Sequence, residues 1–484
     1  MKIKKRIKQT EKRERKLRKW IEKTDNGFAW LVKTCTPLVK TLRQTFLSVP
    51  FAVAETLFAI LIVALGEEVA GAVAFVALLC IKLVVCEDVF TTTLPFLLLC
   101  AFVTNCYDSF DLFIGYIVWA PLAVVCVLFH FIVYAKPVKN GESAKGIFAV
   151  TIAVMLGGIG RFSVMEYVKG AYYIFGLGAG MLVAYYLMKS QFATGRRYDK
   201  KERLSLIMTL WGCLCVAIVG LGYMKVALDW GTRGYSIGFS RNNISTMLMF
   251  AMPFPLFLGI KRKWLDVCTP LFFMAICATT SRGGVIFGGV EFIVCCVYWV
   301  MTNGKTARGR IIRACVCLAV SALVVLCVRG PIYEVLYERI FENAKLTEEA
   351  RYKMLFQAWE KFVENPLLGT GLLDNATAYG EVKKVGAMGW YHMMIPQIFA
   401  SMGLVGVAAY AYQGFFRIKS IFTKTGSWSL CLGISYLGIL MMSQVNPGEF
   451  CPLPFELLTV LLFIFQELRL QENSLPYDRE LLGQ

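Results

Sequence analysis

Apolar residues form long runs along most of this chain, and short polar stretches separate the runs. They begin near Phe51, end near Gln466, and most are about as long as a membrane-spanning helix. A bilayer core about 30 Å thick requires roughly 20 apolar residues for each helical crossing. The pattern therefore predicts an all-α, polytopic membrane protein with about fourteen transmembrane helices.

The predicted spans are joined by short connections, except for one long connection before the last three spans. The spans cover residues 51–66, 69–86, 94–107, 112–135, 146–165, 171–188, 204–227, 244–260, 264–280, 283–302, 311–328, 394–416, 428–445 and 453–467. The long connection comprises residues 329–393, and connections of this length usually carry function. We therefore expect the functional residues to lie in or beside it.

The 484 residues are 57% hydrophobic and only 17% charged, and the formal net charge is +18. Eleven of the basic residues lie within the first nineteen positions, and most others lie in alternate short connections, such as residues 189–203 and 417–424. This distribution is typical of cytoplasmic segments and does not indicate nucleic-acid binding. It places both termini in the cytoplasm and residues 329–393 outside.

These patterns divide the chain into three parts. Residues 1–50 form a basic segment in the cytoplasm or at the membrane surface, where membrane lipids are its expected partners. Residues 51–467 form the transmembrane domain with the outer loop, and residues 468–484 form a cytoplasmic tail.

The outer loop contains a second pattern, in residues 347–365. Apolar side chains recur there at helical spacing, including Tyr352, Phe356 and Trp359, and Pro366 follows the pattern. This spacing predicts an amphipathic helix that ends before Pro366. Two interpretations stay open: the helix rests on the membrane surface, or it shapes a site.

The chain contains only two histidines. His130 lies near one end of the fourth span, within apolar neighbours, and we expect it to be a packed residue. His392 lies where the outer loop re-enters the membrane, and its imidazole is suited to accept a proton from a sugar hydroxyl. A structural role at the interface is the alternative for His392.

Two arginines lie at predicted outer helix ends. Arg241 precedes Asn242 and Asn243, either of which is suited to cap the eighth span. Arg282 precedes Gly283 and Gly284, which would let a ligand approach the backbone. A guanidinium grips phosphate oxygens in a two-pronged contact, so the two arginines are candidates to bind a diphosphate. Anchoring to lipid phosphate is the alternative.

The sequence offers little sign of a metal or cofactor. Asp108 and Asp111 are the nearest outward pair of carboxylates, and a solvated turn explains them better than a metal site. The cysteines lie mostly within apolar runs and show no metal-ligand spacing. We expect no cofactor and no metal ion.

Four stretches resemble, in the same order, the O-antigen ligase and polysaccharide polymerase family of bacterial membrane glycosyltransferases. They are SIGFSRNNISTML, TTSRGGVIFGG, EEARYKMLFQAWEKFVENPLLGTG and YHMMIPQIFASMGLVGV. The resemblance extends over about residues 200–445.

The resemblance implies a function on the outer face of the bacterial cytoplasmic membrane. The expected partners are an oligosaccharide linked to undecaprenyl diphosphate and a glycan or lipid acceptor. The implied catalytic residues are His392, Arg282 and Arg241, and the implied substrate-binding residues are Arg351, Asn243, Ser281 and Gly283. Polymerisation is preferred over ligation. A transporter or flippase of lipid-linked sugars is the alternative, but no inverted repeat is visible in the sequence.

Overall fold

The computed structural model is helical throughout the residues that it describes. These are residues 37–86, 89, 93, 95–99, 117–134, 140–157, 174–194, 200–228, 241–303, 306–328, 337, 344–372, 391–423, 425–446 and 448–472. No β-strand occurs within these ranges. The prediction of an all-α protein is therefore confirmed.

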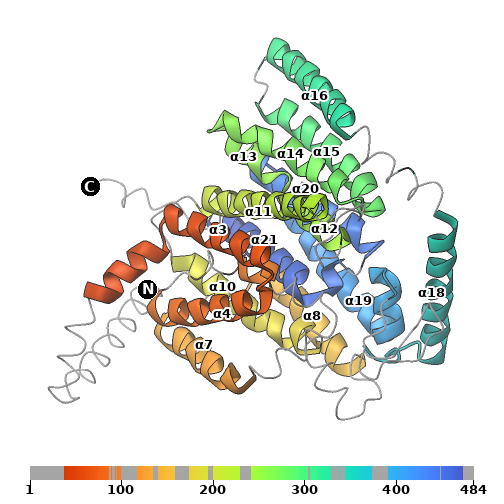
Figure 1. The fold of residues 1–484 in the computed structure, drawn as a ribbon. Coiled ribbons are helices and arrows are strands. Elements are labelled where there is room, and N and C mark those ends of the chain that lie inside the picture. Colours follow the sequence, from red (N-terminus) through yellow and green to blue (C-terminus); the bar gives the residue numbers. More distant parts are fainter. Residues whose placement is uncertain are drawn as a thin grey trace.

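The helices follow the apolar runs of the sequence, and Figure 1 shows their arrangement. They are α3 (Val49–Leu65), α4 (Glu68–Val85), α7 (Ala120–Tyr134), α8 (Glu142–Gly157), α10 (Ala179–Thr194), α11 (Lys200–Leu228), α12 (Arg241–Ala251), α13 (Phe254–Gly259), α14 (Cys268–Ala278), α15 (Arg282–Asn303), α16 (Ala307–Val328), α18 (Ala344–Glu364), α19 (Met394–Thr423), α20 (Ser427–Ser443) and α21 (Leu457–Glu472). Short 3-10 or π turns cover Ile117–Trp119, Lys263–Val267, Gly448–Phe450 and Pro452–Glu456.

Five described helices are long and apolar enough to cross a membrane, or six if the bent pair Pro37–Phe46 and Val49–Leu65 is one span. The predicted total of about fourteen is not confirmed. The predicted span 244–260 consists of two helices, α12 and α13, because the chain is interrupted at Pro253. Other helices, such as α20, are apolar but shorter. The apolar helices nevertheless support a multi-pass membrane protein.

Some predicted features lie outside the described residues. They include residues 1–36 of the basic segment, most of the span 94–107, Asp108 and Asp111, residues 158–165 of the fifth span, much of the loop 329–393 and residues 473–484 of the tail. The proposed boundary between the transmembrane domain and the tail, at residue 467, falls within α21, which continues to Glu472. The extracytoplasmic placement of residues 329–393 stays a prediction.

Helix α21 lies inside the bundle, where it packs against α10, α8, α19 and α20 (Figure 1). Its side chains from Leu457 to Leu468 are all buried, so it has no polar face directed to solvent. A helix that is apolar all round is typical of such a central position. Within Leu457–Leu468 the polar side chains have partners inside the protein, as in the ion pair of 2.8 Å between Lys189 Nζ and Glu467 Oε2.

Helix α19 is broken at Gly403, whose backbone has a φ of 60° and a ψ of −153°. The break is bridged by residues 366–371, which follow α18. Thr370 N and Gly371 N donate to the carbonyl oxygens of Ala400 and Ser401, at 2.9 and 3.0 Å.

The other side of the break is bridged in the same way. Leu404 N and Val405 N donate to the carbonyl oxygens of Pro366 and Leu367, at 2.8 and 3.2 Å. Irregular backbone is tolerated within a membrane protein only where its polar groups are satisfied by protein or by water. Residues 366–371 therefore supply the hydrogen bonds that the broken helix lacks.

We predict that Gly403→Ala prevents correct folding. Its φ and ψ are almost exclusive to glycine and cost other residues about 1–3 kcal/mol. A Cβ there would also collide with the backbone of Pro366 and Leu367. The measurement is the yield and thermal unfolding of purified protein.

Gly414→Ala is the matched control, because Gly414 lies on the same helix and a Cβ there meets no atom within 4 Å. Equal stability of the two variants would show that the break does not depend on Gly403.

Candidate functional site

The turn between α14 and α15 holds Arg282 in a fixed position. The Ser281 hydroxyl accepts a hydrogen bond from Gly284 N at 3.1 Å, which makes Ser281 the N-cap of α15. The same hydroxyl donates to Asn242 Oδ1 at 2.7 Å. Thr280 has a φ of 56°, a region that a β-branched residue rarely adopts. Arg282 is thus the first residue of a helix that begins at a strained, well-anchored turn.

The first turn of α12 lies against this turn. Arg241 Nη1 donates to the Thr280 hydroxyl at 3.1 Å. Asn243 Oδ1 accepts from Asn446 Nδ2 at 2.9 Å, so α12 is also tied to the segment after α20. The prediction that Asn242 or Asn243 caps the helix is wrong, because α12 already begins at Arg241. Both asparagines instead bond to other elements.

The structure gives Gly283 and Gly284 a different role from the one that the sequence suggested. A Cβ at Gly283 would meet Val445 Cγ2 at 2.7 Å, and a Cβ at Gly284 would meet Ser245 at 2.6 Å. The space beside each glycine is therefore filled by a neighbouring residue, whereas the sequence suggested room for a ligand. The glycines allow the N-terminus of α15 to pack closely against α12 and the end of α20.

Arg351 lies on α18, the helix predicted in residues 347–365, and its side chain extends toward Arg282 and the segment after α20. Its Nη2 lies 3.5 Å from the carbonyl oxygen of Val445, in the segment after α20. Partial burial and the nearby Arg282 guanidinium lower the pKa of Arg351. Arginine still carries its charge at neutral pH. Two like charges are thus held close together at this end of the bundle.

His392 lies two residues before the start of α19, close to Arg351. Its φ is 53°, which is uncommon outside glycine. Tyr391 N donates to Gln397 Oε1 at 3.0 Å, which fastens this segment to the first turn of α19. The His392 residue keeps contact with solvent, but desolvation of its ring and the charge of Arg351 lower its pKa. The imidazole is therefore neutral at neutral pH and is able to accept a proton.

Arg241, Arg282, Arg351 and His392 thus meet at one end of the bundle, although they come from four helices or helix starts. Among the described residues, none of the three arginines forms an ion pair with a carboxylate. Clustered guanidinium groups without a carboxylate partner favour the binding of an anion with several oxygens. In the same described ranges, no group of three histidine, cysteine or acidic residues is arranged to hold a metal ion.

His130 has a different environment, as expected. It is 1% exposed, and its Nδ1 lies 2.8 Å from the carbonyl oxygen of Leu83. The prediction that His130 is a packed residue is confirmed.

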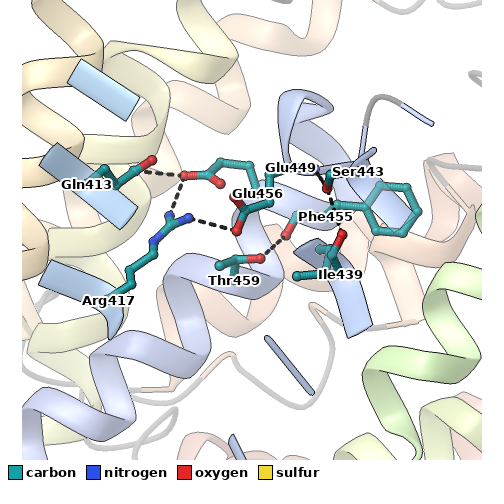
Figure 2. A network of polar contacts seen from close by, with 8 residues as sticks. All are labelled: Gln413, Arg417, Ile439, Ser443, Glu449, Phe455, Glu456 and Thr459. Carbon is teal, nitrogen blue, oxygen red and sulfur yellow. Dashed lines mark hydrogen bonds and ion pairs between the residues drawn. The ribbon is translucent and has the colours of Figure 1, made fainter. Parts of the chain in front are cut away.

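The sequence did not indicate a buried network around Arg417, which Figure 2 shows. Arg417 Nη1 lies 2.9 Å from Glu449 Oε1, and Nη2 lies 2.7 Å from Glu456 Oε1. Gln413 Nε2 donates to the same Glu456 oxygen at 3.2 Å. The charge pattern placed Arg417 in a basic loop, but the residue lies within α19 and is 2% exposed. The signal in the sequence was the pair of acidic residues Glu449 and Glu456, because carboxylates within an apolar region usually have a buried partner.

This network fixes the segment that runs from α20 to α21. Glu449 N also donates to the Ser443 hydroxyl at 3.2 Å, at the end of α20 (Figure 2). Between these two positions lie Val445, whose carbonyl contacts Arg351, and Asn446, which bonds to Asn243. The Arg417 network therefore supports the site from inside the bundle, without touching it.

We predict that Arg417→Met destabilises the protein by about 3–5 kcal/mol, because two buried carboxylates lose their cation. The triple variant Arg417→Met/Glu449→Gln/Glu456→Gln removes all three charges and should recover much of that loss. The measurement is thermal unfolding in detergent.

Lys361→Met is the control, since Lys361 forms a more exposed ion pair with Glu364 and such pairs contribute little. A triple variant no more stable than Arg417→Met would contradict the assignment of the loss to unpaired charge.

Residues 268–411 match a family model described as O-antigen ligase. The match extends from α14 into α19 and includes Arg282, Arg351 and His392, whereas Arg241 and the Glu449 segment lie outside it. No curated protein matches the chain. Over these residues the chain is similar to O-antigen ligases, and the match supports a membrane glycosyltransferase-type enzyme.

Proposed function

We propose that this protein transfers or polymerises an oligosaccharide linked to undecaprenyl diphosphate. In this proposal the site lies on the outer face of the bacterial cytoplasmic membrane, and both termini lie in the cytoplasm. Residues 51–467 form the glycosyltransferase domain, between the basic segment 1–50 and the tail 468–484. Polymerisation is preferred over ligation to a lipid acceptor, because ligation requires one particular acceptor.

One observation carries this proposal: three arginines that pair with no carboxylate in the described part of the chain converge with a neutral histidine. Arg241 and Arg282 are joined through the strained 279–281 turn, and Arg351 and His392 approach from α18 and the start of α19. A lipid diphosphate offers several anionic oxygens to such a cluster. The histidine offers the base that an acceptor hydroxyl requires.

The proposed reaction is a direct displacement with inversion at the anomeric carbon. The acceptor oxygen forms a bond to the anomeric carbon of the donor sugar, and the bond from that carbon to the diphosphate oxygen breaks. The acceptor proton passes to His392, and the lipid diphosphate leaves with the bonding electrons.

Negative charge grows on the diphosphate during this step. Positive groups fixed in advance stabilise such a transition state without reorganising at the moment of reaction. The guanidinium groups of Arg241, Arg282 and Arg351 supply this charge, and the proposal therefore requires no metal ion.

We predict that Arg282→Lys and Arg241→Lys each abolish most of the transfer in a strain that lacks the native protein. Lysine keeps the charge but cannot make the planar two-pronged contact with phosphate. Lipid-linked oligosaccharide should then accumulate, and extraction of the membrane lipids measures it. Single repeat units would indicate a polymerase, and full-length chains would indicate a ligase.

Arg262→Lys is the control, because Arg262 is exposed and pairs with Glu202 at the far end of α13. Near-normal product from both site variants would reject the diphosphate site.

We predict that His392→Ala abolishes transfer, whereas His130→Ala lowers only stability. Because the pKa of His392 is depressed, wild-type activity should persist below the ordinary histidine pKa and fall as the pH drops further. Arg351→Gln removes one of the causes of this depression. The acid limb of its residual activity should therefore move to higher pH.

These measurements require kcat/KM as a function of pH with the purified protein and a lipid-linked donor. Full activity of inserted His392→Ala protein would remove this residue from the site. If the fall of kcat/KM at low pH occurs at the same pH in Arg351→Gln as in the wild type, the group that titrates there is not His392.

A further inference from the structure

Helix α18 presents three different faces, and the first of them packs against the protein. Met354 is 4% exposed and Ala358 is fully buried, and both lie in a cluster with Tyr391 and Ala400. The Phe362 ring lies 5.6 Å from that of Phe399. Arg351 is on this side as well, one turn before Met354 and two turns before Ala358. This face joins α18 to the beginning of α19.

The second face is polar. It carries Lys353, Gln357, Glu360, Lys361 and Glu364, which follow one another at helical spacing. Lys361 Nζ and Glu364 Oε2 form an ion pair of 3.0 Å, with 31% and 53% of their side chains exposed. Charged residues in such numbers indicate a face in contact with water.

The third face is apolar and largely uncovered by the described parts of the chain, although the edge of the Trp359 ring contacts Phe399 of α19 at a centroid distance of 6.3 Å. Tyr352 is 62% exposed, Phe356 65%, Trp359 55% and Val363 60%. Their spacing of four, three and four residues places them in one stripe along the helix. A continuous exposed apolar stripe usually marks an interaction surface.

The position of α18 indicates which surface covers this stripe. Figure 1 shows α18 at the edge of the molecule, where it runs across the direction of α4 and α11 and does not run along it. It packs on the first turns of α19, which is one of the candidate membrane spans. A helix that lies across the end of a spanning helix lies near the plane of the membrane surface.

Further exposed apolar side chains occur just after α18 and on α19, the helix that it packs on. Leu367, just after α18, is 62% exposed, and Ile395 and Leu404 of α19 are each 54% exposed. Tyrosine and tryptophan are enriched where a protein crosses the boundary between lipid and water. Val363 and Leu367 offer no hydrogen bonds to a sugar, so a lipid leaflet fits this face better than a glycan does.

We propose that the aromatic stripe of α18, defined by Tyr352, Phe356, Trp359 and Val363, inserts into the lipid leaflet on the side of the arginine cluster. The polar face then points to water and the packed face rests on α19. Because Arg351 belongs to the same rigid helix, this lipid contact holds the guanidinium beside Arg282 and His392. The membrane surface itself becomes part of the support for the site.

The first test locates the stripe directly and does not depend on the reaction. The photoreactive residue benzoylphenylalanine replaces Phe356 in the full-length protein, which is reconstituted in phospholipid nanodiscs and irradiated. The matched control carries the same residue at Glu360, on the polar face. Mass spectrometry should find phospholipid adducts at position 356 and few or none at position 360.

Equal lipid labelling at both positions would overturn the proposal, as would its absence at position 356. Adducts at position 356 with a glycan or with another protein, obtained in cells, would assign the stripe to that partner and would also overturn it.

The second test asks whether lipid holds α18 in place. In nanodiscs, Tyr352→Ser/Phe356→Ser should make the amides of residues 351–364 exchange hydrogen at least about tenfold faster, because two large apolar side chains no longer hold the helix at the membrane. Glu360→Ser/Glu364→Ser, on the same helix, should leave exchange nearly unchanged.

Unchanged exchange in the aromatic variant would show that α19 alone holds α18, and it would refute the supporting role of lipid. Both tests report on membrane contact, so loss of the proposed reaction with intact lipid labelling would refute the function and not this inference.

Discussion

The hydrogen bonds between residues 366–371 and the break in α19 determine where the candidate site residues lie. Gly403 interrupts α19, and the freed backbone groups on both sides of it bond to the chain that leaves α18. Arg351 is on α18, and His392 lies two residues before the start of α19. Because the joint locks these two helices together, it also fixes the arginine relative to the histidine. The same joint explains the glycine at position 369, since a Cβ there would collide with the backbone of Ser401.

A second support acts from the opposite side. The ion pairs of Arg417 with Glu449 and Glu456 fasten the irregular segment between α20 and α21, and that segment presents Val445 and Asn446 to the site. Buried charges are costly, and they persist where their partners are placed accurately. The site is thus held by neutral backbone hydrogen bonds on the α18 side and by a charged network on the α20 side.

The parts of this protein that could be predicted from sequence are those set by local patterns. The amphipathic pattern in residues 347–365 gave the position of α18, and the unusual settings of His392 and Arg282 drew attention to them. The break at Gly403 could not be predicted, because hydropathy does not show whether an apolar run is one helix or two. The break at Pro253 had a signal in the proline itself, which the hydropathy pattern alone did not use. The partners of Arg417 were also missed, since a basic residue near a helix end has the same sequence pattern whether it is solvated or paired with distant carboxylates.

Two residues with strained backbone show why the site needs the joint at residues 366–371 and the Arg417 network. Thr280 and His392 are the non-glycine residues with positive φ in that part of the chain, and both belong to the arginine cluster. Such conformations cost about 1–3 kcal/mol each and persist only where the surroundings determine them. The turn at Thr280 is held by Arg241 and the Ser281 cap, and the segment at His392 is held by Gln397. Stability gained in the joint and the buried core therefore offsets strain at the site, which keeps the guanidinium groups and the imidazole in place before any anion binds.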